Sequence, residues 1–233
     1  MRMLTEVEDR HWWYAERRHI LRRLVAWLPS GKALDVGAAG GGNTRVLTSL
    51  GWDAVALEYT PEGAQVAASR GIPVLRGDAT RLPVAGASLD LVIALDVLEH
   101  LEDDGAAARE IYRVLRPGGA LVVTVPVDMR LWSAHDEAVG HVRRYTEAEL
   151  VALLTGAGFQ VVGRRSWMVL LRPLVALRRK ASSGSDLDDP PWWLNRALGA
   201  AVSLDRLPGL GRLRGVSLVL WARRPVAHQD GNR

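Results

Sequence analysis

Four glycines lie within the six positions 37–42, directly after the apolar run of residues 33–36. A glycine-rich turn between a strand and a helix lets backbone amides approach a bound ligand closely, and a plain tight turn rarely needs so many glycines. The series Gly37-x-Ala39-x-x-Gly42 differs by one residue from the dinucleotide fingerprint, in which the second position is glycine. We therefore predict a ligand site here, although the loop alone does not choose the ligand.

Carboxylates follow the later apolar runs. Glu58 ends the next run, about twenty residues after the loop, where an acidic side chain binds the ribose hydroxyls of nucleotide cofactors. Several cofactor classes need that carboxylate, so Glu58 does not discriminate between them. Asp78 and Asp96 follow two further apolar runs.

Three histidines, His100, His135 and His141, have side chains that could accept a proton near neutral pH. His100 follows an apolar run, where packing or capping is the more common role. His135 and His141 lie in a loop at the edge where α/β sheets place ligands. Either could be a general base, or both could fix the loop together with residues 143–145. The sequence predicts no metal site, because too few ligands cluster in it.

The 233-residue chain is 48% hydrophobic and 24% charged, which excludes wholesale disorder, collagen and coiled coil. It has no cysteine, so disulfides, thiolate nucleophiles and cysteine-bound metals are excluded. A net charge of +4 does not indicate a nucleic-acid partner. We expect no signal peptide and no membrane span, and hence a cytoplasmic protein.

Short apolar runs alternate with helical patterns along the chain, which predicts an α/β fold with a parallel sheet. The predicted strands lie near residues 33–37, 54–58, 73–77, 89–96, 120–126, 159–167 and 215–225, and the predicted helices near 43–50, 61–70, 104–115 and 146–156.

Two helical segments flank this core. Residues 1–30 form an aromatic, arginine-rich helical entry, in which Trp13, Tyr14 and Arg18 could cover a cofactor or simply dock the helix. Residues 168–214 form a helical insertion before the last strand, with a turn-rich linker at 181–191. We divide the chain into a lid (1–30), a core (31–167 and 215–225) and this insertion, and we expect the tail after Pro225 to fray.

The insertion mixes tryptophans and leucines with arginines. That composition is typical of an interfacial helix at an anionic bilayer, of a lid over a long apolar acceptor, or of a helical cap or homodimer contact. Base stacking on RNA is a weaker alternative, because no basic run or RNA-binding module accompanies the tryptophans.

The run from about residue 33 to 126 resembles the class I S-adenosylmethionine-dependent methyltransferases, in the methyltransferase type 11 subgroup. The resemblance rests on the motifs at 34–43, 77–79, 95–101 and 116–119, in that order. HWWYAERR near the N-terminus and HDEAVGHVRRYTEAEL at 135–150 are similar to a subgroup of these enzymes. Ala39 departs from the family by replacing the middle glycine of DxGxG.

The resemblance implies a Rossmann-like, seven-stranded, mostly parallel sheet of order 3-2-1-4-5-7-6 with helices on both faces. It also implies S-adenosylmethionine as cofactor and S-adenosylhomocysteine as product. With the lid residues Trp13, Tyr14 and Arg18, the expected cofactor contacts are Asp35, Gly37, Ala38, Ala39, Gly41, Glu58, Tyr59, Asp78, Ala79, Leu95 and Asp96.

The predicted reaction is methyl transfer to an oxygen, nitrogen or carbon nucleophile of a small or lipid-like metabolite, with His141 or His135 as candidate catalytic base. The alternatives are a nicotinamide-dependent oxidoreductase and a non-catalytic S-adenosylmethionine-binding protein. We expect no nucleic-acid partner, and the insertion could give peripheral contact with the inner membrane surface.

Overall fold

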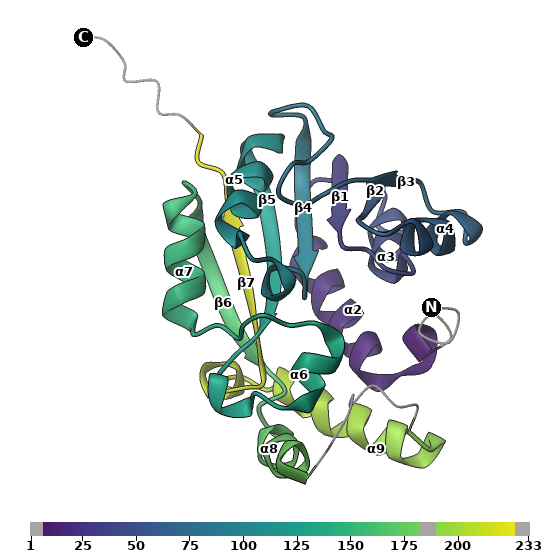
Figure 1. The fold of residues 1–233 in the computed structure, drawn as a ribbon, viewed down its shortest axis with the longest axis vertical. Helices are drawn as coiled ribbons and strands as arrows, with labels where there is room; N and C mark the ends of the chain where they lie inside the picture. The colour runs from purple at the N-terminus through teal and green to yellow at the C-terminus, as the bar shows by residue number, and fades with distance from the viewer. Residues whose placement is uncertain (1–6, 182–189, 227–233) are drawn as a thin grey trace.

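The structure of the protein is a computed structural model. It describes residues 7–181 and 190–226, without the side chains of residues 180 and 181. Its seven strands form one sheet of order β3-β2-β1-β4-β5-β7-β6 (Figure 1). All neighbouring pairs are parallel except those of β7, which runs antiparallel to β5 and β6. The strands are β1 (Lys32–Val36), β2 (Asp53–Glu58), β3 (Val74–Arg76), β4 (Leu89–Leu95), β5 (Leu115–Pro126), β6 (Gln160–Trp167) and β7 (Ser217–Arg223). The predicted fold and strand order are therefore confirmed.

Helices cover both faces of the sheet, as predicted. They are α2 (Trp12–Val25), α3 (Gly42–Ser49), α4 (Pro61–Ser69), α5 (Asp104–Val114), α6 (Ala134–Val139), α7 (Glu147–Gly156), α8 (Arg172–Ala181) and α9 (Trp192–Ser203). On one face, Ile111 of α5 and Leu150 of α7 pack into the main apolar cluster. On the other face, Leu21 of α2, Leu47 of α3 and Val202 of α9 share a second cluster.

Local signals in the sequence explain where the helices begin. Thr60 caps α4 by accepting a hydrogen bond from the Gly63 amide, with Pro61 in the first turn. Thr146 and Glu149 form a capping box at the start of α7. The short helix α6 was not predicted, and it begins at another capping box, between Ser133 and Asp136.

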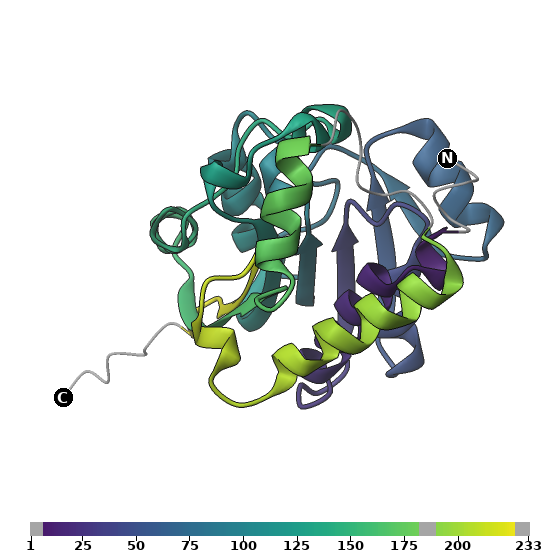
Figure 2. The ribbon, with the colours of Figure 1, turned by 90° about the horizontal axis from the view of Figure 1, so that it is seen from below.

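The segment between β6 and β7 is helical, as predicted, and contributes α8 and α9. These helices lie with α2 and α6 around the carboxyl ends of the parallel strands (Figures 1 and 2). Helices α2 and α9 run side by side, and the Trp12 amide donates a 2.8 Å hydrogen bond to the side chain of Asn195. The tail after residue 226, most of the predicted linker (182–189) and the first six residues of the lid lie outside the described residues.

Within the part of the chain that the structure describes, no helix is both long enough and apolar enough to cross a membrane.

Candidate active site at the carboxyl edge of the sheet

The glycine-rich loop leaves β1 through three residues in the left-handed region: Gly37 (φ 68°), Ala39 (φ 49°) and Gly41 (φ 76°). Gly37 must be glycine on steric grounds also, since a Cβ there would lie 2.7 Å from Cγ2 of Val97. Ala39 adopts the conformation of the glycine it replaces, at a cost of about 1–2 kcal/mol. The departure from the family pattern therefore places a non-glycine residue in a backbone conformation that favours glycine.

Glu58, at the end of β2, turns its carboxylate toward this loop. The carboxylate accepts a hydrogen bond from the Ala39 amide, and burial raises the pKa of Glu58. A side chain at Gly63 in the first turn of α4 would overlap the carboxylate, so that glycine makes room for it. The Glu58 carboxylate and the glycine-rich loop therefore lie in contact at the position where the sequence predicts a ribose site.

Two aspartates follow the central strands. Asp35, near the end of β1, is buried and accepts a 2.7 Å hydrogen bond from the Thr44 hydroxyl, and burial raises its pKa to about 7. Asp96, directly after β4, has a left-handed backbone (φ 59°). Strained residues of this kind cluster at functional sites. Its carboxylate accepts a 3.0 Å hydrogen bond from Arg17 on α2.

A pocket of about 510 Å³ opens beside these residues. Gly37, Ala39, Leu95 and Asp96 contribute to its lining, which joins it to the predicted cofactor site. The insertion supplies much of the remaining wall, through apolar residues of and around α8 and α9: Met168, Leu171, Leu174, Val175, Leu194 and Leu198. The core and the insertion thus share one largely apolar pocket.

The aromatic residues of α2 both dock the helix and face this pocket. Trp13 stacks on Trp167 of β6 with ring centroids 5.6 Å apart, and both Trp13 and Tyr14 line the pocket. Arg17 lies over the Trp13 ring at 4.6 Å and also lines the pocket. Arg18 instead donates a hydrogen bond to the backbone carbonyl of Glu8, and it is not among the lining residues. Of these two arginines of α2, Arg17 lines the pocket, and a role of Arg18 toward a cofactor stays a prediction.

The loop after β5 brings His135 and His141 into the pocket wall. Nδ1 of His141 lies 2.8 Å from a carboxylate oxygen of Asp136, which is fully buried and also pairs with Arg144 at 2.8 Å. A carboxylate only accepts, so Nδ1 of the neutral ring carries the proton and Nε2 is left free to accept one. The Asp136–Arg144 pair fixes the loop, and the orientation of His141 is compatible with a general base. The catalytic role of His141 stays a prediction.

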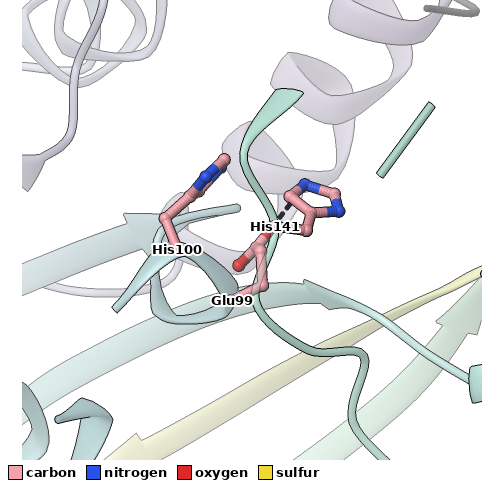
Figure 3. A group of neighbouring side chains, drawn as sticks. All are labelled: Glu99, His100 and His141. Carbon is pink, nitrogen blue, oxygen red and sulfur yellow. Dashed lines mark ion pairs between the residues drawn. The ribbon is translucent and has the colours of Figure 1, made fainter. Parts of the chain in front are cut away.

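Glu99 and His100 complete this wall, on the short 3₁₀ turn after β4. Figure 3 shows the two imidazole rings on either side of the Glu99 carboxylate. Nε2 of His141 lies 3.9 Å from Glu99, and the rings of His100 and His141 meet edge to face at 4.8 Å. Burial and the neighbouring His141 lower the pKa of His100.

Some predicted cofactor contacts lie apart from this pocket. Tyr59 is 71% exposed, and the exposed Asp78 accepts hydrogen bonds from the backbone and hydroxyl of Thr80. Ala79 is buried beside it. These residues follow β2 and β3, so they lie along the same sheet edge as Glu58 and outside the pocket lining. Their roles toward an adenosine group stay predictions.

The described residues fit S-adenosylmethionine. The open left-handed loop, the Glu58 carboxylate beside it and the carboxylate of Asp96 at the pocket lie along one edge, with apolar surface next to them. The carboxylates of Glu58 and Asp96 can accept hydrogen bonds from hydroxyl groups and can attract a positive charge. They suit a ligand that carries both. The contact residues themselves stay predictions.

Sequence reasoning gave no role to Glu99 of the pocket wall, although an acidic residue beside a histidine directly after a strand was a usable signal. It considered Arg17 and Arg18 together as arginines of the lid, and chose Arg18 as the cofactor contact. Whether Arg17 or Arg18 faces the pocket depends on how α2 is rotated about its axis. The sequence pattern did not define that rotation to within one residue.

Comparison with known proteins agrees with the resemblance noted in the sequence. Residues 34–123 match the family model described as a methyltransferase domain. The observed sheet order is the one that the resemblance to class I S-adenosylmethionine-dependent methyltransferases implies, and the cofactor of such enzymes is S-adenosylmethionine.

Among curated proteins, this chain is 28% identical over 166 residues to a protein of Mycolicibacterium smegmatis named as a probable S-adenosylmethionine-dependent methyltransferase, covering 69% of this chain and 64% of that protein. It is 37% identical over 121 residues to the demethylmenaquinone methyltransferase of Mycolicibacterium vanbaalenii, covering 52% and 51%. The alignments thus span only half to two thirds of these relatives. A solved S-adenosylmethionine-dependent methyltransferase from Archaeoglobus fulgidus shares the fold, with a TM-score of 0.64, 15% identity and coverage of 90% and 93%.

Proposed function

We propose that this methyltransferase transfers a methyl group from S-adenosylmethionine to a nucleophile on a largely apolar, lipid-like or quinone-like acceptor. One observation carries the proposal: the pocket that reaches Gly37 and Asp96 continues between the apolar residues of α8 and α9. Pockets of about 300–1,000 Å³ bury most of a drug-sized ligand, and this one, of about 510 Å³, lies in that range. An apolar wall of this kind favours a hydrocarbon tail or ring system over a small polar acid.

S-adenosylmethionine supplies an electrophilic methyl group on a positively charged sulfur, which an acceptor nucleophile displaces in line. The chain contributes mainly alignment and exclusion of water. The Gly37–Gly41 loop and Glu58 would hold the nucleoside and methionine parts, and Asp96 would face the positively charged end. The lid aromatics Trp13 and Tyr14 would cover the pocket.

An acceptor hydroxyl must lose its proton, and two histidines of the pocket are candidates for taking it. His141 is oriented by Asp136 at Nδ1, and its Nε2 lies 3.9 Å from the Glu99 carboxylate. His135 lines the same pocket, with its ring centroid 6.2 Å from that of His141. A neutral imidazole of either residue could accept the proton while the acceptor oxygen keeps the electron pair for the new bond.

The similarity to demethylmenaquinone methyltransferases supports a quinone-like acceptor. It covers only half of this chain. The proposal therefore needs a direct test with acceptors that differ only in the tail. The purified chain is incubated with methyl-labelled S-adenosylmethionine and a prenylated quinol, a glycolipid or a tail-free quinol. We expect label in the tailed acceptors; equal or exclusive labelling of tail-free compounds would reject the apolar-tail part of the proposal.

We further propose that the insertion meets a membrane surface, from which an apolar acceptor would enter. Trp192 and Trp193 at the start of α9 are 76% and 58% exposed, and Leu177 of α8 is 70% exposed. The exposed Arg178 and Arg196 lie on the same two helices. Exposed tryptophans beside arginines are typical of helices that bind anionic bilayers.

Co-sedimentation with anionic and neutral vesicles tests the membrane proposal. The intact chain is compared with the W192S/W193S variant, whose fold is checked by its stabilisation by S-adenosylhomocysteine. We expect the intact chain to sediment preferentially with anionic vesicles and the variant to sediment less. If neither sediments, the exposed face fits a subunit contact, which analytical ultracentrifugation detects as a homodimer.

A further inference from the structure

The carboxyl group of Glu99 lies in the pocket wall without a hydrogen bond. Glu99 is fully buried, it lines the pocket, and neither of its oxygens has a hydrogen-bond partner among the described residues. An ionised carboxylate in such a place is costly unless a proton or a cation compensates it. The site therefore favours a cation or a proton at these oxygens.

Both neighbouring histidines are held so that Nε2 is the free nitrogen. Nδ1 of His141 is hydrogen-bonded to the Asp136 carboxylate at 2.8 Å, and Nδ1 of His100 lies 3.1 Å from the Gly140 carbonyl. Both partners only accept, so the proton is on Nδ1 in each neutral ring. Metal-binding histidines are oriented in the same way, by a carboxylate or carbonyl behind the ring.

We propose that Glu99, His100 and His141 bind a divalent transition-metal ion in the acceptor pocket. One ligand atom from each residue lies within 4.8 Å of the others, and the Glu99–His141 pair is 3.9 Å apart (Figure 3). Two ligands about 2.1 Å from one ion are at most about 4.2 Å apart. His100 is the exposed member, so its side chain has room to adjust toward a shared ion.

The ligand set indicates the class of metal. Two imidazoles and one carboxylate suit zinc, iron(II), manganese or cobalt, whereas magnesium and calcium prefer oxygen ligands throughout. Three protein ligands also leave a coordination position for a further oxygen, as in catalytic zinc sites. The sequence did not predict this site, because His141 is remote from Glu99 in the chain and the 3₁₀ turn and the α6 loop bring them together.

The catalytic role that we infer for the metal ion rests on the proposed function. The open position would take the acceptor oxygen from the pocket. An ion lowers the pKa of a bound hydroxyl, so the proton leaves more readily, to His135, and the oxygen keeps its lone pair for the methyl carbon. His141 would then be a ligand, and His135 would be the base.

Metal binding is tested without acceptor or cofactor. The full chain, with any affinity tag removed, is dialysed against EDTA and titrated with Zn²⁺ by calorimetry and with Co²⁺ by visible absorption. We expect one ion per chain and Co²⁺ bands of a nitrogen–oxygen site. E99Q, H100Q and H141Q should each weaken binding by more than about ten-fold. H135Q is the matched control, a histidine of the same pocket outside the ligand set, and should bind like the wild type.

Two results would overturn the inference: no stoichiometric binding, or binding that E99Q, H100Q and H141Q leave unchanged. Because His100 is exposed, H100Q should leave the fold intact, and weaker binding in this variant then reports the loss of a ligand. Stabilisation of the same samples by S-adenosylhomocysteine reports on the proposed function separately. Its persistence in the metal-free chain, together with absent Zn²⁺ binding, would reject the metal site and leave the methyltransferase proposal standing.

Discussion

The guanidinium of Arg17 donates a 3.0 Å hydrogen bond to the carboxylate of Asp96, 79 positions later in the chain. Both side chains are largely buried, at 10% and 16% exposure. The pair connects helix α2 to the carboxyl end of β4, and so joins the predicted lid to the pocket.

Arg17→Ala should therefore loosen this connection. Removing one partner leaves a largely buried carboxylate unpaired, and we expect the free energy of unfolding to fall by about 1–3 kcal/mol. Urea denaturation measures the change. Arg22→Ala is the matched control, because Arg22 is an exposed arginine of the same helix and should change stability by no more than about 0.5 kcal/mol. Equal effects of the two substitutions would remove the special role of Arg17.

Glu58→Ala should weaken the binding of S-adenosylhomocysteine. If Glu58 accepts the ribose hydroxyls, its loss removes hydrogen bonds to a charged group, worth about 1.5–3 kcal/mol, and affinity should fall ten-fold or more. Calorimetry gives the dissociation constant. Glu62→Ala, which removes an exposed carboxylate from the first turn of α4, is the control. Unchanged affinity in Glu58→Ala would take Glu58 out of the ribose role.

Asp35 should make stability depend on pH. Its pKa is raised from 3.8 to about 7 in the folded protein, so between these values the folded state keeps a proton that the unfolded state has lost. This contribution is fully present below pH 3.8, decreases as the pH rises and is gone above about 7.

Asp35→Asn removes that titration. The free energy of unfolding of the variant, relative to wild type, should rise between pH 4 and 7 by up to about 4 kcal/mol and then level off. Denaturation curves at a series of pH values measure it. A difference that does not vary with pH would contradict a raised pKa at Asp35.

Leu174→Ser should impair use of an apolar acceptor without affecting the cofactor. Leu174 lines the pocket from α8, and burying a leucine side chain against an apolar ligand is worth about 1.5–3 kcal/mol. We expect KM for a tailed acceptor in detergent to rise about ten-fold, with S-adenosylhomocysteine affinity unchanged. Leu177→Ser, on the same helix outside the lining residues, is the control. The same KM in both variants would argue against an acceptor tail beside α8.

The sequence predicts the core of this fold well, because strong local signals agree with the global pattern. The positions of α4 and α7 were predicted from turn residues and apolar periodicity. The strand order was predicted from the family resemblance, and the sheet confirms it. The glycine loop and Glu58 come together as expected, since parallel strands bring their carboxyl ends to one edge.

The acceptor side was less predictable, for a physical reason. The pocket joins segments remote in sequence, such as Arg17 to Asp96 and Glu99 to His141. Such contacts depend on helix rotation and loop path. The α6 helix, which orients His141 through Asp136, was expected to be a loop. The roles of His135 and His141 therefore stay predictions.

Methyl transfer to a tailed acceptor tests the account most directly. The wild-type chain is incubated with isotope-labelled S-adenosylmethionine and two acceptors, a prenylated quinol and the same head group without its tail. Mass spectrometry measures the labelled product. We predict transfer to the prenylated acceptor with a kcat/KM at least ten-fold higher than for the tail-free one. Transfer to neither acceptor, or equal transfer to both, would contradict the proposed role of the apolar pocket between α8 and α9.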